Sequence, residues 1–86
     1  MNIRESIQEL YPDFEFLFMD GYDDCIVGVC RRYGFEEPVI AYDEEKVLLK
    51  LMFSGLSEEE AQEFFEFNQI GAWVGEKTPV FIQLLT

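Results

Sequence analysis

The sequence contains no histidine and only two cysteines, and both shortages limit the chemistry that the chain can perform. Without histidine there is no Ser-His or Cys-His nucleophile system, no histidine base and no histidine-containing zinc site. Cys25 and Cys30 fit neither a CxxC redox motif nor a zinc knuckle. We therefore expect two small core thiols; a disulfide or a reactive thiol is the alternative. We expect no catalytic residue, no metal site and no cofactor.

Basic residues are also scarce, with 6 Lys and Arg against 18 Asp and Glu and a formal net charge of −12. A protein that binds nucleic acid directly needs the opposite sign of charge, and an anionic membrane surface would repel this chain. No apolar run approaches the roughly 20 residues of a spanning helix. The first residues, MNIRESIQELYPDF, lack the pattern of a signal peptide, so we expect a cytoplasmic protein.

The chain is nevertheless rich in apolar residues, and this composition predicts a folded protein. Apolar residues make up 49% and aromatic residues 16% of the 86 positions, which is too much for a disordered acidic segment. This length suits one domain, so we expect a single domain over residues 1–86.

The first part of the chain predicts a helix, a strand and a turn. Residues 2–10 have helical apolar spacing, with Asn2 as a cap and Pro12 as a stop. The aromatic run FEFLFM, residues 14–19, predicts a buried strand. The polar segment 20–24 predicts a turn.

Residues 25–32, CIVGVCRR, are compatible with a strand or with a helix between Asp24 and Gly34. We favour the strand, because residues 38–42, PVIAY, follow a short connection and would pair with it as a hairpin.

The remainder predicts two helices and a last strand. Asp43 is a good N-cap for a helix over residues 44–53, and Ser57 with Glu60 forms a capping-box pattern for the next helix, over residues 57–70. Residues 79–85, PVFIQLL, predict the final strand. The order is therefore α-β-β-β-α-α-β, a small α+β domain with a short antiparallel sheet and two or three helices packed on it.

Three carboxylates of the predicted helix 57–70 form a line along one face. Glu59, Glu63 and Glu66 are spaced i, i+4, i+7, and no Lys or Arg occurs between positions 51 and 76. Like charges at this spacing cost about 0.2–0.5 kcal/mol per pair. An ordinary solvated face is one interpretation. The other is a partner-binding surface, with Asp20, Asp23 and Asp24 nearby if the fold permits.

A calcium loop and an aromatic segment are the other candidate binding sites. A calcium loop beginning at Asp20 would need Gly at its sixth position and Glu at its twelfth, but Cys25 and Arg31 stand there. Phe67 falls off the apolar face of its predicted helix, and Trp73 lies between two glycines. Core packing is the default for Trp73, and an aromatic anchor for a protein partner is the alternative.

Three motifs resemble a family of small acidic accessory proteins of tailed phages and prophages. They are D-D-x-I-x-G at residues 23–28, PVxxYDxxKV at residues 38–47 and SxEEAxEFFEFNxxGAWVGExTPVF at residues 57–81. The resemblance covers about residues 19–82. It implies a phage-derived accessory protein in the host cell cytoplasm, and it brings no catalytic or binding residue with it.

Two functional hypotheses follow from the charge and the resemblance. The first is an inhibitor of a host nucleic-acid-binding defence protein, of the anti-CRISPR or anti-restriction type. Its acidic face would occupy a basic groove, such as that of a nuclease, by nucleic-acid mimicry. The second is a small non-enzymatic interaction or self-associating adaptor module that uses the aromatic surface around Phe67, Trp73 and Phe81.

Overall fold

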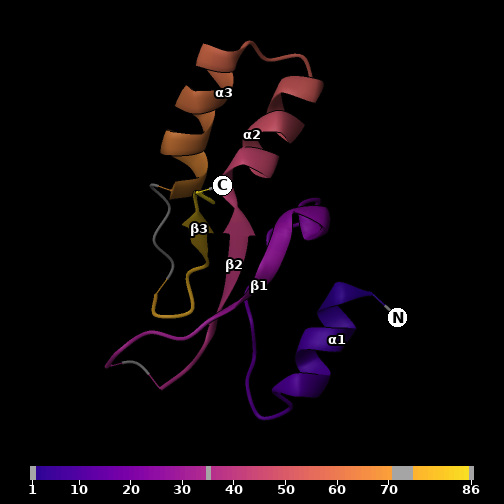
Figure 1. Cartoon of the computed structure of the whole chain (residues 1–86), viewed down its shortest axis with the longest axis vertical. Helices are drawn as coiled ribbons and strands as arrows, with labels where there is room; N and C mark the ends of the chain where they lie inside the picture. The colour runs from indigo at the N-terminus through magenta and orange to yellow at the C-terminus, as the bar shows by residue number, and fades with distance from the viewer. Residues whose placement is uncertain (1, 35, 71–74, 86) are drawn as a thin grey trace.

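The computed structural model describes residues 2–34, 36–70 and 75–85. In these ranges the elements are, in chain order, α1 (Ile3–Leu10), the short 3-10 helix η1 (Asp23–Cys25), β1 (Ile26–Cys30), β2 (Val39–Asp43), α2 (Glu44–Phe53), α3 (Glu58–Phe65), the π-helical turn η2 (Glu66–Ile70) and β3 (Val80–Ile82). The predicted α+β class is confirmed (Figure 1).

The helices begin where the capping residues of the sequence predict. Asn2 and Asp43 each accept hydrogen bonds from backbone N–H groups in the first turns of α1 and α2. At α3 the capping box is complete: the N–H of Glu60 donates to Ser57 Oγ at 3.2 Å, and the N–H of Ser57 donates to Glu60 Oε1 at 2.9 Å. These bonds satisfy N–H groups that have no partner inside the helix.

The hairpin predicted for residues 25–42 is present, and its first arm is a strand. β1 pairs antiparallel with β2, with Ile26 opposite Tyr42 and Cys30 opposite Val39. The register shifts between Ile26 and Gly28. A glycine inside a strand commonly marks such an irregularity, because it has no side chain to hold the regular pairing.

The sheet is mixed, so the prediction of an antiparallel sheet was wrong for its last strand. β3 spans only Val80–Ile82 of the predicted 79–85, and it pairs in parallel with β2 in the order β1-β2-β3. A parallel pair needs a long crossover connection. The helical pair α2 and α3 belongs to that connection, and β3 therefore runs in the same direction as β2 (Figure 1).

The strand predicted over residues 14–19 is also absent: the segment has no regular secondary structure. Its burial still alternates as in a strand, with Phe14, Phe16 and Phe18 half-buried and the residues between them exposed. The side chains therefore pack with strand periodicity, but the backbone lacks a ladder partner. The N–H of Met19 instead donates to the hydroxyl of Tyr42 at 2.7 Å.

One core joins the sheet to all three helices. Its buried members are Ile7, Cys25, Ile40, Tyr42, Val47, Leu51, Ala61 and Phe65. The ring of Phe81 stacks on Tyr42 with centroids 5.9 Å apart and meets Phe65 edge-on at 4.9 Å. The pair α2 and α3 extends beyond the end of β2, while α1 lies beside the segment that precedes η1 (Figure 1). Among the described helices, none has the length and apolar character that crossing a membrane requires.

Candidate functional site

The three glutamates predicted to line one face of α3 are exposed there. Glu59 and Glu63 lie on α3, and Glu66 caps its C-terminal end in helical conformation, so the i, i+4, i+7 spacing is retained. Within the described residues none of the three enters an ion pair, and Glu66 accepts only a long hydrogen bond of 3.5 Å from Gln62 Nε2. The structure therefore presents these three residues as a free acidic line.

Phe67 and Trp73 are the two aromatic candidates for partner binding. Phe67 directly follows the acidic line, in the first turn of η2, and its side chain is 83% exposed. Trp73 lies outside the described residues. Exposed aromatic rings are enriched at protein-binding surfaces, where aromatic anchors supply much of the affinity.

The aspartates of the turn before β1 have local partners. Arg4 Nε donates to both carboxylate oxygens of Asp23, at 2.9 and 3.0 Å, and Arg4 Nη2 lies 3.3 Å from Asp20 Oδ1. The same guanidinium lies over the ring of Phe18, 4.7 Å from its centroid. These contacts fasten α1 to the turn. They give Asp20 and Asp23 a structural role that sequence analysis missed, because Arg4 is 16 and 19 positions away.

The third aspartate pairs with α2. Lys50 Nζ lies 2.7 Å from Asp24 Oδ1, and this hydrogen bond lowers the pKa of Asp24 and raises the pKa of Lys50. Because η1 and α3 both contact α2, which lies between them in Figure 1, the aspartates do not join the acidic line. The two acidic groups of the sequence are therefore separate surfaces.

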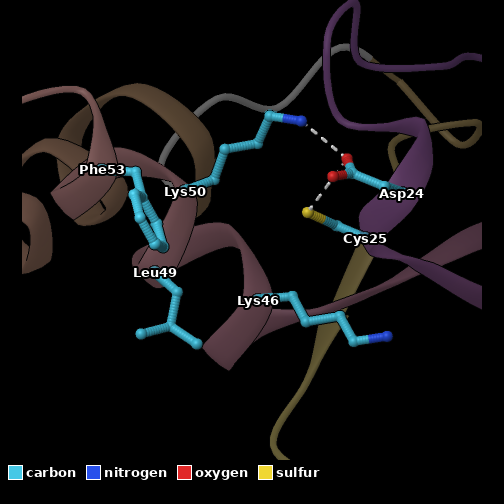
Figure 2. A pocket seen from close by; sticks show the side chains of 6 residues that line it. All are labelled: Asp24, Cys25, Lys46, Leu49, Lys50 and Phe53. Atoms are coloured by element: carbon cyan, nitrogen blue, oxygen red, sulfur yellow. Dashed lines mark hydrogen bonds and ion pairs between the residues drawn. The ribbon is translucent and has the colours of Figure 1, made fainter.

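A pocket of about 410 Å³ lies between η1 and α2 (Figure 2). Its lining residues are Asp24, Cys25, Lys46, Leu49, Lys50 and Phe53. Two lysines and two large apolar side chains thus face one hollow of a strongly acidic chain. The i, i+4 spacing of Lys46 and Lys50, and of Leu49 and Phe53, was the available sequence signal, because residues four apart share one side of a helix.

The thiol that lines this pocket is shielded and lies beside a carboxylate. Cys25 is buried and its Sγ lies 3.8 Å from Asp24 Oδ1. Burial, together with the negative charge of Asp24, raises the pKa of the Cys25 thiol, so the reactive thiolate is disfavoured. Among the described residues no group of three or more Cys, Asp and Glu side chains could hold a metal ion.

Comparison of the chain with protein-family models, with curated proteins and with solved structures finds no match in any of the three. The functional conclusion therefore depends on the charges, the exposed side chains and the geometry described above.

Proposed function

We propose that this chain is a phage-encoded, non-enzymatic inhibitor that binds a host defence protein in the host cytoplasm. It would occupy a basic surface on which that protein normally holds nucleic acid. The observation that carries the proposal is the acidic line of Glu59, Glu63 and Glu66, which is exposed and has no ion pair among the described residues. The resemblance to accessory proteins of tailed phages supplies the context of host defence.

The spacing of the acidic line supports mimicry of a nucleic-acid strand. At 1.5 Å rise per residue, the seven-residue step from Glu59 to Glu66 spans roughly 10 Å and carries three charges. That is about one charge per 5 Å, compared with one per 3.4 Å along each strand of DNA. The line therefore has about two thirds of the charge density of one strand, and its three residues lie on α3 and at its C-terminal end.

The position of the cations in this chain supports a role for the line outside its own fold. Arg4 and Lys50 pair with the aspartates of the turn, and Lys77 Nζ lies 3.9 Å from Glu15 Oε2. Repulsion between neighbouring carboxylates opposes helix formation, so local stability alone does not favour three of them in a row. A cationic partner would relieve that repulsion, and complementary charge would make association fast and sensitive to salt.

The test is charge reversal along the line. Immobilised protein captures binding proteins from a bacterial host lysate, and the affinity of each captured protein is then measured with and without competing DNA or RNA. The variant Glu59→Lys, Glu63→Lys, Glu66→Lys should weaken binding by at least about tenfold, and DNA or RNA should displace the wild-type chain.

The matched control is the variant Glu9→Lys, Glu36→Lys, Glu37→Lys, which reverses three exposed glutamates elsewhere. Each reversal adds two charges, so both triple variants have a net charge of −6 instead of −12. The proposal expects the control to retain most of the affinity. An equal loss of affinity in both variants would show that binding depends only on net charge. Unchanged affinity in both would show that the acidic line is not the binding surface.

A self-associating adaptor module is the second candidate function, and the exposure of large apolar side chains favours it. Phe53 is 91% exposed at the C-terminal end of α2, and Phe67 is 83% exposed in η2. Sedimentation equilibrium tests this candidate directly. Self-association should strengthen as salt screens the repulsion between two chains of net charge −12, whereas a monomer at every salt concentration would exclude it.

A further inference from the structure

A groove runs along the outer side of the α2–α3 pair, and its floor is apolar. A hollow of about 270 Å³ is lined by Glu45, Leu48, Leu49, Met52, Glu58 and Gln62. Leu49 is 47% and Met52 37% exposed, although both are large apolar residues in the middle or second half of a helix. An apolar floor that stays in contact with water is a common property of recognition grooves.

The groove continues to the C-terminal segment of the chain. A second hollow of about 350 Å³ shares Glu45, Leu48 and Gln62 with the first and adds the exposed Leu84 and Leu85. Gln83 Nε2 donates to Glu44 Oε2 at 2.6 Å, and this bond holds the segment at the base of α2. In Figure 1 the segment that follows β3 accordingly lies beside the start of α2.

The groove is lined by acidic side chains, whereas the pocket between η1 and α2 is lined by two lysines. The side chains that line the two hollows include Glu44, Glu45 and Glu58 and no Lys or Arg. Lys46 and Lys50 line the pocket of Figure 2 on the adjoining side of α2, and Leu49 borders both that pocket and the groove. An acid-lined groove and a lysine-lined pocket therefore adjoin along α2, and a cationic ligand would be attracted to the groove and repelled from the pocket.

We propose that the α2–α3 groove binds a basic amphipathic helix of the partner protein, with its apolar stripe on Leu49 and Met52 and its Lys or Arg residues against Glu45 and Glu58. This inference deepens the proposed function, because it names the kind of segment that the basic partner presents. Helix-in-groove recognition uses anchors at i, i+3 or i+4, and i+7, which span about 10 Å. The step from Glu45 to Met52 along α2 has the same length, and a third helix packed there would complete a helical layer.

The probe is a synthetic peptide of about 15 residues, roughly four helical turns, with leucine at helical spacing and lysine or arginine elsewhere. A second peptide has the same composition in an order without helical periodicity. Fluorescence anisotropy at physiological ionic strength measures binding, and circular dichroism measures the helix that forms on binding. The amphipathic peptide should bind at least about tenfold more tightly than the permuted one.

Two pairs of neighbouring residues supply matched variants. Met52→Asp should weaken binding of the amphipathic peptide by at least about tenfold, whereas Phe53→Asp, with the same change of charge on the same helix, should not. The added carboxylate alone would attract a basic peptide. A loss of affinity in Met52→Asp would therefore show that the apolar contact of Met52 contributes to binding. Glu58→Gln should likewise weaken binding more than Glu59→Gln, because only Glu58 lines the groove. Met52→Gln replaces Met52→Asp if the latter lowers the unfolding midpoint.

The outcomes separate this inference from the proposed function. If Met52→Asp and Phe53→Asp change the affinity for the amphipathic peptide equally, or if both peptides bind equally, the groove supplies no specific contact and the groove proposal is wrong. If the triple reversal of the acidic line leaves capture of the host protein intact while Met52→Asp abolishes it, the groove proposal stands and mimicry by the acidic line fails. If the triple reversal abolishes capture while Met52→Asp leaves it intact, the acidic line is the binding surface and the groove proposal is wrong.

Discussion

Replacing Tyr42 by phenylalanine should destabilise the protein through one hydrogen bond. Tyr42 is fully buried in the central strand, and its hydroxyl accepts from the N–H of Met19 at 2.7 Å. The phenylalanine ring would keep the stacking on Phe81, so the variant removes little besides the acceptor. The hydroxyl of Tyr42 is also the contact that replaces a ladder bond for the aromatic segment 14–19.

The magnitude follows from the burial of this bond. A half-buried N–H group that loses its acceptor costs about 1–3 kcal/mol, and relief from burying the hydroxyl offsets part of that. We expect the free energy of unfolding to fall by about 1–2 kcal/mol. For a chain of 86 residues this lowers the melting temperature by roughly 5–10 °C.

Thermal and urea denaturation followed by circular dichroism measure the loss, and hydrogen exchange at the Met19 amide locates it. The matched control is Tyr33→Phe, because Tyr33 is fully exposed and the chemical change is identical. Unchanged stability in Tyr42→Phe, or equal losses in both variants, would refute the role given to this hydrogen bond. Retained exchange protection at Met19 would refute it as well.

The titration of Tyr42 gives a second measurement. Burial raises the pKa of Tyr42, since the ionised phenol is disfavoured in the core. The folded chain therefore keeps this proton at a pH where the unfolded chain has begun to lose it. The resulting stability is present below about pH 10 and is lost as the pH rises through the raised pKa, so Tyr42→Phe should show a shallower alkaline decline.

Three further predictions concern the capping box and the cysteines. Ser57→Ala should lower the free energy of unfolding by about 1 kcal/mol in urea denaturation, against little change for Ser6→Ala, and equal effects would contradict the capping role. The backbone hydrogen bond from Ser57 lowers the pKa of Glu60. The stability that ionised Glu60 contributes is therefore present near neutral pH and is lost as the pH falls through that lowered pKa. Glu60→Gln should consequently show a smaller loss of stability on acidification. In the native protein a thiol reagent such as DTNB should modify the half-buried Cys30 well before the buried Cys25, whose pKa burial raises, and the two should react alike in guanidinium. Fast native modification of Cys25 in a Cys30→Ser variant would show that the thiol is more accessible than its burial indicates.

The local features of this fold could be predicted from the sequence. Asn2, Asp43 and Ser57 mark the starts of α1, α2 and α3, because a cap is a contact between residues two or three positions apart. The spacing of Glu59, Glu63 and Glu66 likewise places them on one face of a helix whatever that helix packs against. The hairpin of β1 and β2 could be predicted for a similar reason, because only a short connection separates its two strands.

Other features depend on contacts between distant parts of the chain, and only the tertiary structure decided them. The segment 14–19 has the burial pattern of a strand, yet the hydroxyl of Tyr42, 23 positions away, takes the place of a ladder partner. β3 runs parallel to β2 because of the path that the chain takes through α2 and α3.

The charges of the chain also divide into features that the sequence determined and features that the tertiary structure decided. Composition determined that the chain is anionic, and helical spacing determined one acidic line. The ion pairs that neutralise the aspartates before β1 and the groove between α2 and α3 depend on elements far apart in sequence that meet in space. No local pattern predicts such meetings, because the packing of the whole core determines them.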